Sequence, residues 1–422
     1  MSARAAVRRG LLVVAVAATA VLSGTAGAAP TSPSALSARS RGAASLPAFY
    51  RVPAHIPSRP GTLIREEPVH AGGVAGTTYR VMYVSTSLST RPEAVTGLVV
   101  VPKGAAPAGG FPVVAWGHGT NGMATQCAPS LHPGTTGAKN AFEEVNALLA
   151  QRWIVTASDY QGEGTPGPLP YLVGGIAARN TLDLVRAVHH LPGVQASAST
   201  VVWGHSEGGL TAMFSLHIAA SYAPTLHLEG VVAGAPPSQF AFVYTALLKS
   251  PDRFYLVMAA VGYEKAYGAA KAPLRQVLTK RGLALVPDMT KGCFTYLART
   301  VDRYSMQQLV KKNPFDIPAW RTLLQENDPG SFTAAAAAPL LIVQGGTDTT
   351  IPPISTQLLA QHLCSVGQDV ERWIYPRMTH TAVITVSIAD MVHWIADRFA
   401  GGPNPDPYSP VGMAGVQTTT CP

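Results

Sequence analysis

Residues 201–222 combine a short strand, a tight turn and a helix in direct succession, and this order restricts the folds open to the chain. The apolar run at 201–203 leads into Gly-His-Ser-Glu-Gly at 204–208, and the next residues have a helical pattern. Side chains at Gly204 and Gly208 would clash with neighbouring backbone, so the strained turn pushes the Ser206 hydroxyl out at the strand end. The backbone N–H of Glu207 begins the helix, whose dipole favours a developing oxyanion. The pattern indicates a nucleophilic serine; the alternative is a solvated serine in a Gly-rich loop.

Apolar strands alternate with helices along most of the chain. The sequence predicts strands at 78–85, 94–102, 111–116, 153–158, 201–203, 228–234, 339–345 and 370–375, and helices at 140–151, 177–191, 354–364 and 388–400. A turn joins the first two strands, which makes them an antiparallel pair. The later alternation predicts an α/β fold, with a mostly parallel sheet covered by helices on both faces. Ligands of such sheets bind at the carboxyl ends of the strands.

The alternation is interrupted at residues 237–336. This segment contains helical patterns at 255–267 and 306–312, separated by prolines. We expect a helical cap inserted over the strand ends, between a first core part at 46–236 and a second at 337–422. Its aromatic and aliphatic side chains exceed what a thin exposed flap needs, so some could line a binding pocket. A rigid domain without a role in specificity is the alternative.

The N-terminus has the features of an export signal. Three arginines, Arg4, Arg8 and Arg9, precede an apolar run at 11–22 that is too short to span a membrane, and Ala-Gly-Ala at 26–28 offers a cleavage site. We expect a signal peptide at 1–28, a flexible leader rich in Ser, Ala and Pro at 29–45, and a secreted mature protein. The residues leave general and twin-arginine export open.

An even number of cysteines in an exported chain suggests two disulfides. Four residues, Cys127, Cys293, Cys364 and Cys421, allow three pairings. No His/Cys cluster has metal-ligand spacing, so we expect neither a metal nor an organic cofactor. The formal net charge of +8 is modest, and no basic run with interleaved aromatics points to nucleic acid.

A serine needs a base, and the base needs an orienting acid, which follow the serine in this order in chains with this turn. Asp348 follows the strand at 339–345, and His380 follows the strand at 370–375. Asp369 precedes its strand, and His205 lies within the turn, too close in the chain to act as the base for Ser206. The sequence therefore predicts a triad of Ser206, Asp348 and His380. A turn aspartate that caps the next helix is the alternative for Asp348.

A second oxyanion donor is expected in the loop after the strand at 111–116. Gly-His-Gly-Thr at 117–120 fits, because its glycines permit close approach of the backbone to a ligand. The backbone N–H of Gly119 or Thr120 is the candidate. Ordinary turn chemistry would also explain the glycines.

At these residues the sequence resembles the secretory lipases of the Candida antarctica lipase A type. The similar segments are Cys-Ala-Pro-Ser at 127–130, Ser-Asp-Tyr-Gln-Gly-Glu-Gly at 158–164, the turn itself, Ser-Tyr-Ala-Pro at 221–224 and Leu-Glu-Gly at 228–230. The order serine, large insertion, aspartate, histidine also matches, over roughly residues 50–421. The resemblance implies an α/β-hydrolase fold with a helical lid and the hydrolysis of carboxylic esters, with long-chain glycerides as the named substrates. It also implies the pairs Cys127–Cys293 and Cys364–Cys421.

The sequence thus predicts a secreted serine ester hydrolase that forms an acyl-enzyme and acts as a lipase or a lipase-like esterase. A secreted peptidase or amidase on the same fold is one alternative, and a binding protein with a relic site is another. The expected partner is a small-molecule or lipid ester, with transient contact to a lipid interface. We expect a monomer, although the sequence leaves the oligomeric state open. It also leaves open the acyl length, the alcohol moiety and interfacial activation of the lid.

Overall fold

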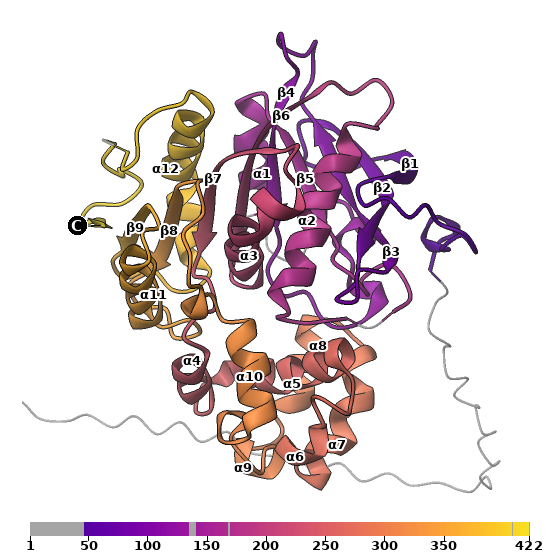
Figure 1. Cartoon of the computed structure of the whole chain (residues 1–422), viewed down its shortest axis with the longest axis vertical. Helices are drawn as coiled ribbons and strands as arrows, with labels where there is room; N and C mark the ends of the chain where they lie inside the picture. The colour runs from indigo at the N-terminus through magenta and orange to yellow at the C-terminus, as the bar shows by residue number, and fades with distance from the viewer. Residues whose placement is uncertain (1–45, 135–140, 168, 407, 422) are drawn as a thin grey trace, which may run out of the picture. The chain divides into compact units, whose positions relative to one another are not determined.

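The fold is built on one sheet of ten strands. The computed structural model describes residues 46–134, 141–167, 169–406 and 408–421. The strand order is β1-β2-β3-β5-β4-β6-β7-β8-β9-β10 (Figure 1). The strands are β1 (Leu63–Val69), β2 (Thr77–Thr86), β3 (Pro92–Val101), β4 (Phe111–Gly117), β5 (Ile154–Ser158), β6 (Ala196–His205), β7 (His227–Gly234), β8 (Leu340–Gly345), β9 (Val370–Tyr375) and β10 (Gln417–Thr420).

The centre of the sheet is parallel and its N-terminal margin is antiparallel, as the sequence predicts, and the other margin is antiparallel as well. Strands β5, β4, β6, β7, β8 and β9 run parallel, so their carboxyl ends share one edge. Strands β2 and β3 form the expected antiparallel pair, and β3 joins the parallel part through β5. The edge strands β1 and β10 were not predicted. Strand β1 carries charged residues and a proline, and all residues of β10 are exposed. Edge strands tolerate charges, proline and exposure, because one side of the strand has no partner strand.

Both faces of the sheet are buried. Alternate residues of one strand enter different cores: Val202 packs on one side, and Val201 and Trp203 on the other. The first core lies under α2 (Gly174–Val188), α3 (Glu207–Tyr222) and α11 (Pro353–Ser365). The second lies under α1 (Ala141–Ala150) and α12 (Ala382–Phe399). Because both faces are covered, the strands are nearly continuous apolar runs, as parallel sheets require.

The segment between β7 and β8 contains no named strand among its described residues. Its helices are α4 (Phe240–Leu247), α5 (Phe254–Tyr267), α6 (Leu274–Val277), α7 (Lys280–Leu285), α8 (Phe294–Val301), α9 (Met306–Leu309) and α10 (Pro318–Glu326), which lie together in Figure 1. They share a core that includes Val257, Leu297 and Trp320 and takes Val173 and Ile176 from the body. The helix expected at 306–312 ends earlier, because Val310 is extended and bridges to Leu278.

Two disulfides lie within the described residues, Cys127–Cys293 and Cys364–Cys421, with Cα atoms 5.4 and 5.3 Å apart. These are the pairs that the family resemblance implies. The first joins the loop after β4 to α8, and the second fixes β10 to α11. The expected signal peptide at 1–28 and leader at 29–45 lie outside the described residues. None of the helices that the structure describes has the length and apolar character needed to cross a membrane.

Candidate active site

The turn between β6 and α3 holds Ser206 in a strained conformation. Its φ and ψ are 59° and −121°, in a region that residues other than glycine rarely adopt. A Cβ on Gly204 would lie 2.2 Å from the Gly208 carbonyl oxygen, and a Cβ on Gly208 would lie 2.0 Å from the Gly117 oxygen. Only glycine fits at both positions. Such strain costs about 1–3 kcal/mol and persists where the surroundings enforce it, which is typical of functional turns.

Three side chains from three strand ends form one hydrogen-bonded chain. His380 Nε2 lies 2.9 Å from Ser206 Oγ, and His380 Nδ1 lies 2.7 Å from Asp348 Oδ2. The Asp348 side chain is fully buried and that of His380 is 12% exposed. The three residues follow β6, β8 and β9, whose parallel course brings their ends together. This geometry allows His380 Nε2 to take the Ser206 proton while Asp348 holds the Nδ1–H tautomer.

Asp348 is itself held by hydrogen-bond donors that the sequence pattern does not predict. The backbone N–H groups of Thr350 and Ile351 donate to Oδ1 at 2.9 and 2.8 Å, and Gln344 Nε2 donates to Oδ2 at 3.1 Å. A carboxylate that accepts several hydrogen bonds is fixed in orientation. The turn after Asp348 is the sequence feature that could have indicated these two backbone amides, but it resembles an ordinary aspartate turn. Gln344 gave no signal, because a polar residue inside an apolar strand has many structural explanations.

His205 packs against His380 and is not part of the hydrogen-bonded series Ser206–His380–Asp348. The two rings lie 4.5 Å apart between centroids. Burial, with the nearby His380, holds the pKa of His205 well below its usual range. A neutral imidazole therefore packs against the His380 ring.

The loop after β4 lies beside Ser206. A Cβ on Gly119 would lie 3.9 Å from the Ser206 Cβ, so this loop and the turn are in close proximity. His118 Nδ1 lies 2.8 Å from the Gly119 oxygen, and burial lowers the pKa of His118 to about 4, so its ring is neutral. The Thr120 hydroxyl is 2.8 Å from the Tyr171 hydroxyl. Gly119 therefore lies next to Ser206, and Glu207 follows Ser206 directly in the chain.

The same loop is bound to the helical segment. The Phe294 N–H donates to the Asn121 oxygen at 2.6 Å, and Gly122 bridges Cys293, whose sulfur pairs with Cys127. A Cβ on Gly122 would lie 2.7 Å from the Cys127 sulfur. The disulfide, the β-bridge between Gly122 and Cys293, and the lack of a Cβ at Gly122 together keep this loop against α8.

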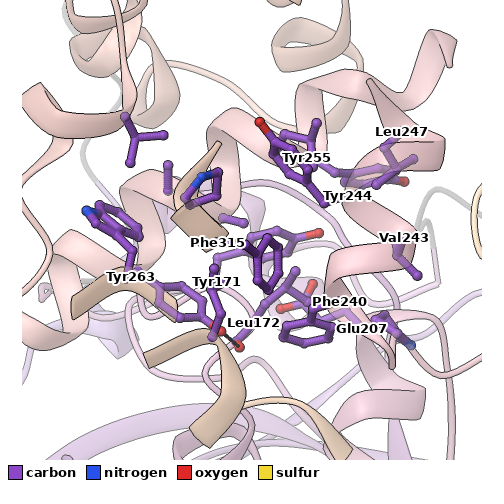
Figure 2. A pocket seen from close by; sticks show the side chains of 18 of the residues that line it. Tyr171, Leu172, Glu207, Phe240, Val243, Tyr244, Leu247, Tyr255, Tyr263 and Phe315 are labelled. Carbon is purple, nitrogen blue, oxygen red and sulfur yellow. Dashed lines mark hydrogen bonds between the residues drawn. The ribbon is translucent and has the colours of Figure 1, made fainter. Parts of the chain in front are cut away.

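A largely apolar cavity that is partly open to solvent lies above Ser206. Its floor is formed by Ser206, Glu207, Tyr171 and Leu172. The rest of its wall comes mainly from the helices between β7 and β8, as Figure 2 shows for Phe240, Val243, Tyr244, Leu247, Tyr255, Tyr263 and Phe315. Its apolar lining is that of small-molecule sites, and an acyl chain would suit such surroundings.

The side chain of Glu207 is an unexpected feature of the floor. The Gly-x-Ser-x-Gly pattern predicts a role only for its backbone N–H. The side chain is buried beside Ser206, and burial raises its pKa to about 8, with a smaller opposing effect from the Thr120 hydroxyl. The direction of this side chain depends on α3 and could not be derived from the Gly-x-Ser-x-Gly pattern. Among the described residues, no group of three His, Cys, Asp or Glu side chains could hold a metal ion.

Known proteins are similar to this chain in sequence and in fold. A probable inactive lipase of Mycobacterium tuberculosis is 24% identical over 375 residues, which cover 85% of this chain and 83% of that protein. A secreted triacylglycerol lipase of Malassezia globosa is 25% identical over 341 residues, or 76% of this chain and 72% of that protein. The crystal structure of Candida antarctica lipase A in its closed state matches with a TM-score of 0.73 and 20% identity, covering 87% of this chain and 88% of that chain. The α/β-hydrolase fold expected from the sequence is therefore confirmed. The family model described as secretory lipase matches residues 135–406, and the chain belongs to this family.

Proposed function

We propose that the chain is a secreted serine hydrolase that cleaves carboxylic esters through an acyl-enzyme. Ser206 Oγ attacks the ester carbonyl carbon as its proton passes to His380 Nε2. The tetrahedral intermediate collapses, its C–O bond to the alcohol breaks, and His380 returns the proton to the leaving alkoxide. Water, deprotonated by the same nitrogen, then attacks the acyl-enzyme and releases the carboxylic acid and Ser206. Asp348 keeps the imidazole oriented and stabilises its positive form.

The observation that carries the proposal is the unbroken chain from Ser206 Oγ through His380 to Asp348, with both links at or below 2.9 Å. The oxyanion would be held by the backbone N–H of Glu207 and that of Gly119 or Thr120. Family membership supports ester chemistry but does not establish activity, because one relative is a probable inactive lipase. Export is supported by the two disulfides and by the name of the secretory lipase family.

We further propose that residues 237–336 act as a cap that selects the acyl group. This segment supplies most of the wall of the cavity above Ser206. The apolar lining favours a lipid or other long apolar ester over a peptide, since peptide bonds would leave polar groups unpaired there. A triacylglycerol is the substrate that the name of the Malassezia relative supports.

The experiment compares the parent protein with Ser206→Ala, using a fluorophosphonate probe and p-nitrophenyl esters from acetate to palmitate, beside aminoacyl p-nitroanilides. We expect labelling of the parent alone, and loss of at least about 10³-fold of its ester turnover in the variant. Circular dichroism checks that the variant folds. Labelling and activity retained in Ser206→Ala would refute the proposal. Faster turnover of the anilides than of any ester would identify an amidase instead.

A further inference from the structure

The Glu207 carboxyl lies between two cavities and has no cationic partner in either. It lines the apolar cavity above Ser206 and also a second, smaller cavity with a mixed polar and apolar lining. The described residues that line these cavities include no Lys or Arg. A buried carboxylate without a cation or several donors is costly, so such a group stays protonated instead.

The ionisable groups that interact with Glu207 are acids and supply no cation. They are Tyr160 and Glu163 from the segment after β5, Tyr171 before α2 and Tyr255 from α5. His380 at the end of β9 bonds to Ser206, the residue before Glu207, and is paired with Asp348 at the end of β8. The Glu163 side chain also lines the smaller cavity and is buried, and its Oε2 has no hydrogen-bond partner among the described residues. Burial, and next to it the nearness of Glu207, raises the pKa of Glu163 well above its usual range. Two adjacent carboxyls without a cation cannot both be charged at moderate cost.

The side chain of Glu207 connects to the loop that carries the second oxyanion donor. Its carboxyl interacts with the Thr120 hydroxyl, which lies 2.8 Å from the Tyr171 hydroxyl. Residue 207 therefore contributes twice. Its backbone N–H is one candidate oxyanion donor, and its side chain interacts with Thr120, which with Gly119 is a candidate for the other. A neutral carboxyl can make these contacts without a charge near the oxyanion, whereas a carboxylate would repel the oxyanion.

We propose that the Glu207 side chain is a positioning group that works as a neutral acid, holds Thr120 beside Ser206, and sets the alkaline limit of turnover when it ionises. This proposal rests on the ester hydrolysis proposed above and identifies a group that limits its rate at alkaline pH. Burial raises the pKa of Glu207 to about 8. If only the neutral form is active, the parent loses about 30-fold in kcat between pH 7 and pH 9.5.

The test measures kcat from pH 6 to pH 9.5 on p-nitrophenyl hexanoate, with spontaneous hydrolysis subtracted. Each variant is compared with itself, as the ratio of kcat at pH 7 to kcat at pH 9.5. In Glu207→Gln we expect a ratio below about 3, because the amide cannot ionise. Glu163→Gln is the matched control, since it removes the other buried carboxyl and should keep the full alkaline loss. Return to pH 7 after incubation at pH 9.5 separates titration from unfolding.

Thr120→Val gives a second and independent readout. The Thr120 hydroxyl lowers the pKa of Glu207, so its removal should move the alkaline loss to higher pH. This variant decides the matter if Glu207→Gln does not fold. An unchanged alkaline loss in Glu207→Gln, its disappearance in Glu163→Gln, or an unshifted loss in Thr120→Val would overturn the inference. Each of these outcomes leaves the proposed hydrolysis intact, whereas activity retained by Ser206→Ala refutes the hydrolysis itself.

Discussion

Replacing Asp348 by Asn tests the proposed triad most sharply, because the two side chains have the same shape. The backbone N–H groups of Thr350 and Ile351 both donate to Oδ1 of Asp348. In Asp348→Asn the amide oxygen must take that position, since the alternative would face two donors with an NH₂ group. The NH₂ group then points at His380 Nδ1, which can only accept from it. The proton moves to Nε2, which faces Ser206 Oγ and can no longer act as the base.

We expect kcat to fall by about 10⁴-fold, the size of effect that the wrong histidine tautomer has in a triad of this kind. This corresponds to about 5.4 kcal/mol of transition-state stabilisation. The fold should survive, because the variant keeps both backbone hydrogen bonds to Oδ1 and loses chiefly the contact with Gln344, worth about 1 kcal/mol. Initial rates on p-nitrophenyl butyrate at pH 7 measure the first effect, and thermal unfolding measures the second.

Asp302→Asn is the matched control, since Asp302 has the same chemistry at a surface ion pair of the helical segment. Its kcat should stay within about twofold of the parent value. The double variant with His380→Ala should be no slower than His380→Ala alone, because residues that act as a unit are not additive. Asp348→Asn with kcat within tenfold of the parent would contradict the reasoning, and His380 would then need another orienting group.

Three further predictions follow from the packing. Removal of the Cys364–Cys421 pair by serine substitution releases a loop of 57 residues and should lower the free energy of unfolding by about 4 kcal/mol in the chain-entropy model, measured by urea titration; a loss below about 1 kcal/mol would contradict it. Glu144 is buried and accepts the indole N–H groups of Trp116 and Trp203, and burial raises its pKa from 4.5 to about 7. The native state thus keeps a proton that the unfolded state releases, so this contribution to stability is lost as pH rises through 7. Glu144→Gln should gain about 3 kcal/mol relative to the parent between pH 4.5 and pH 7, and parallel stability curves would refute this. If the cap selects the acyl group, Phe240→Ala and Val243→Ala should shift the preferred chain length of p-nitrophenyl esters while acetate turnover stays within about threefold, and an unchanged profile would exclude that role.

The arrangement of the site could be predicted wherever it depends on strand order. Ser206, Asp348 and His380 each follow a strand of the parallel part, and parallel strands end at one edge, so their proximity follows from topology. Burial of both faces also follows, because the central strands are apolar without alternation. The local pattern failed at the margins. The charged strand β1 and the exposed β10 are stabilised by neighbours distant in the chain, which composition does not reveal.

The direction of individual side chains is a second limit. The pattern around Ser206 gives the backbone of Glu207, but the burial of its carboxyl depends on residues near 120, 163 and 171. The early end of α9 has the same origin, since Val310 leaves the helix to bridge Leu278. Such contacts join separate segments, and a single sequence contains no local signal for them.

Family membership and catalytic competence are separate conclusions here, and different residues decide them. The match over residues 135–406 spans β5 to β9 and the segments between them, and a probable inactive lipase is also similar to most of this chain. Activity depends on a few atoms at the strand ends. In this chain the serine is held in its strained conformation, the histidine lies within hydrogen-bond distance of it, and the aspartate is fixed by two backbone amides. The strained backbone at Ser206 costs stability, and it persists only because the surrounding structure enforces it. Strain of this kind gathers at functional sites, which is the physical reason to propose a function for these residues.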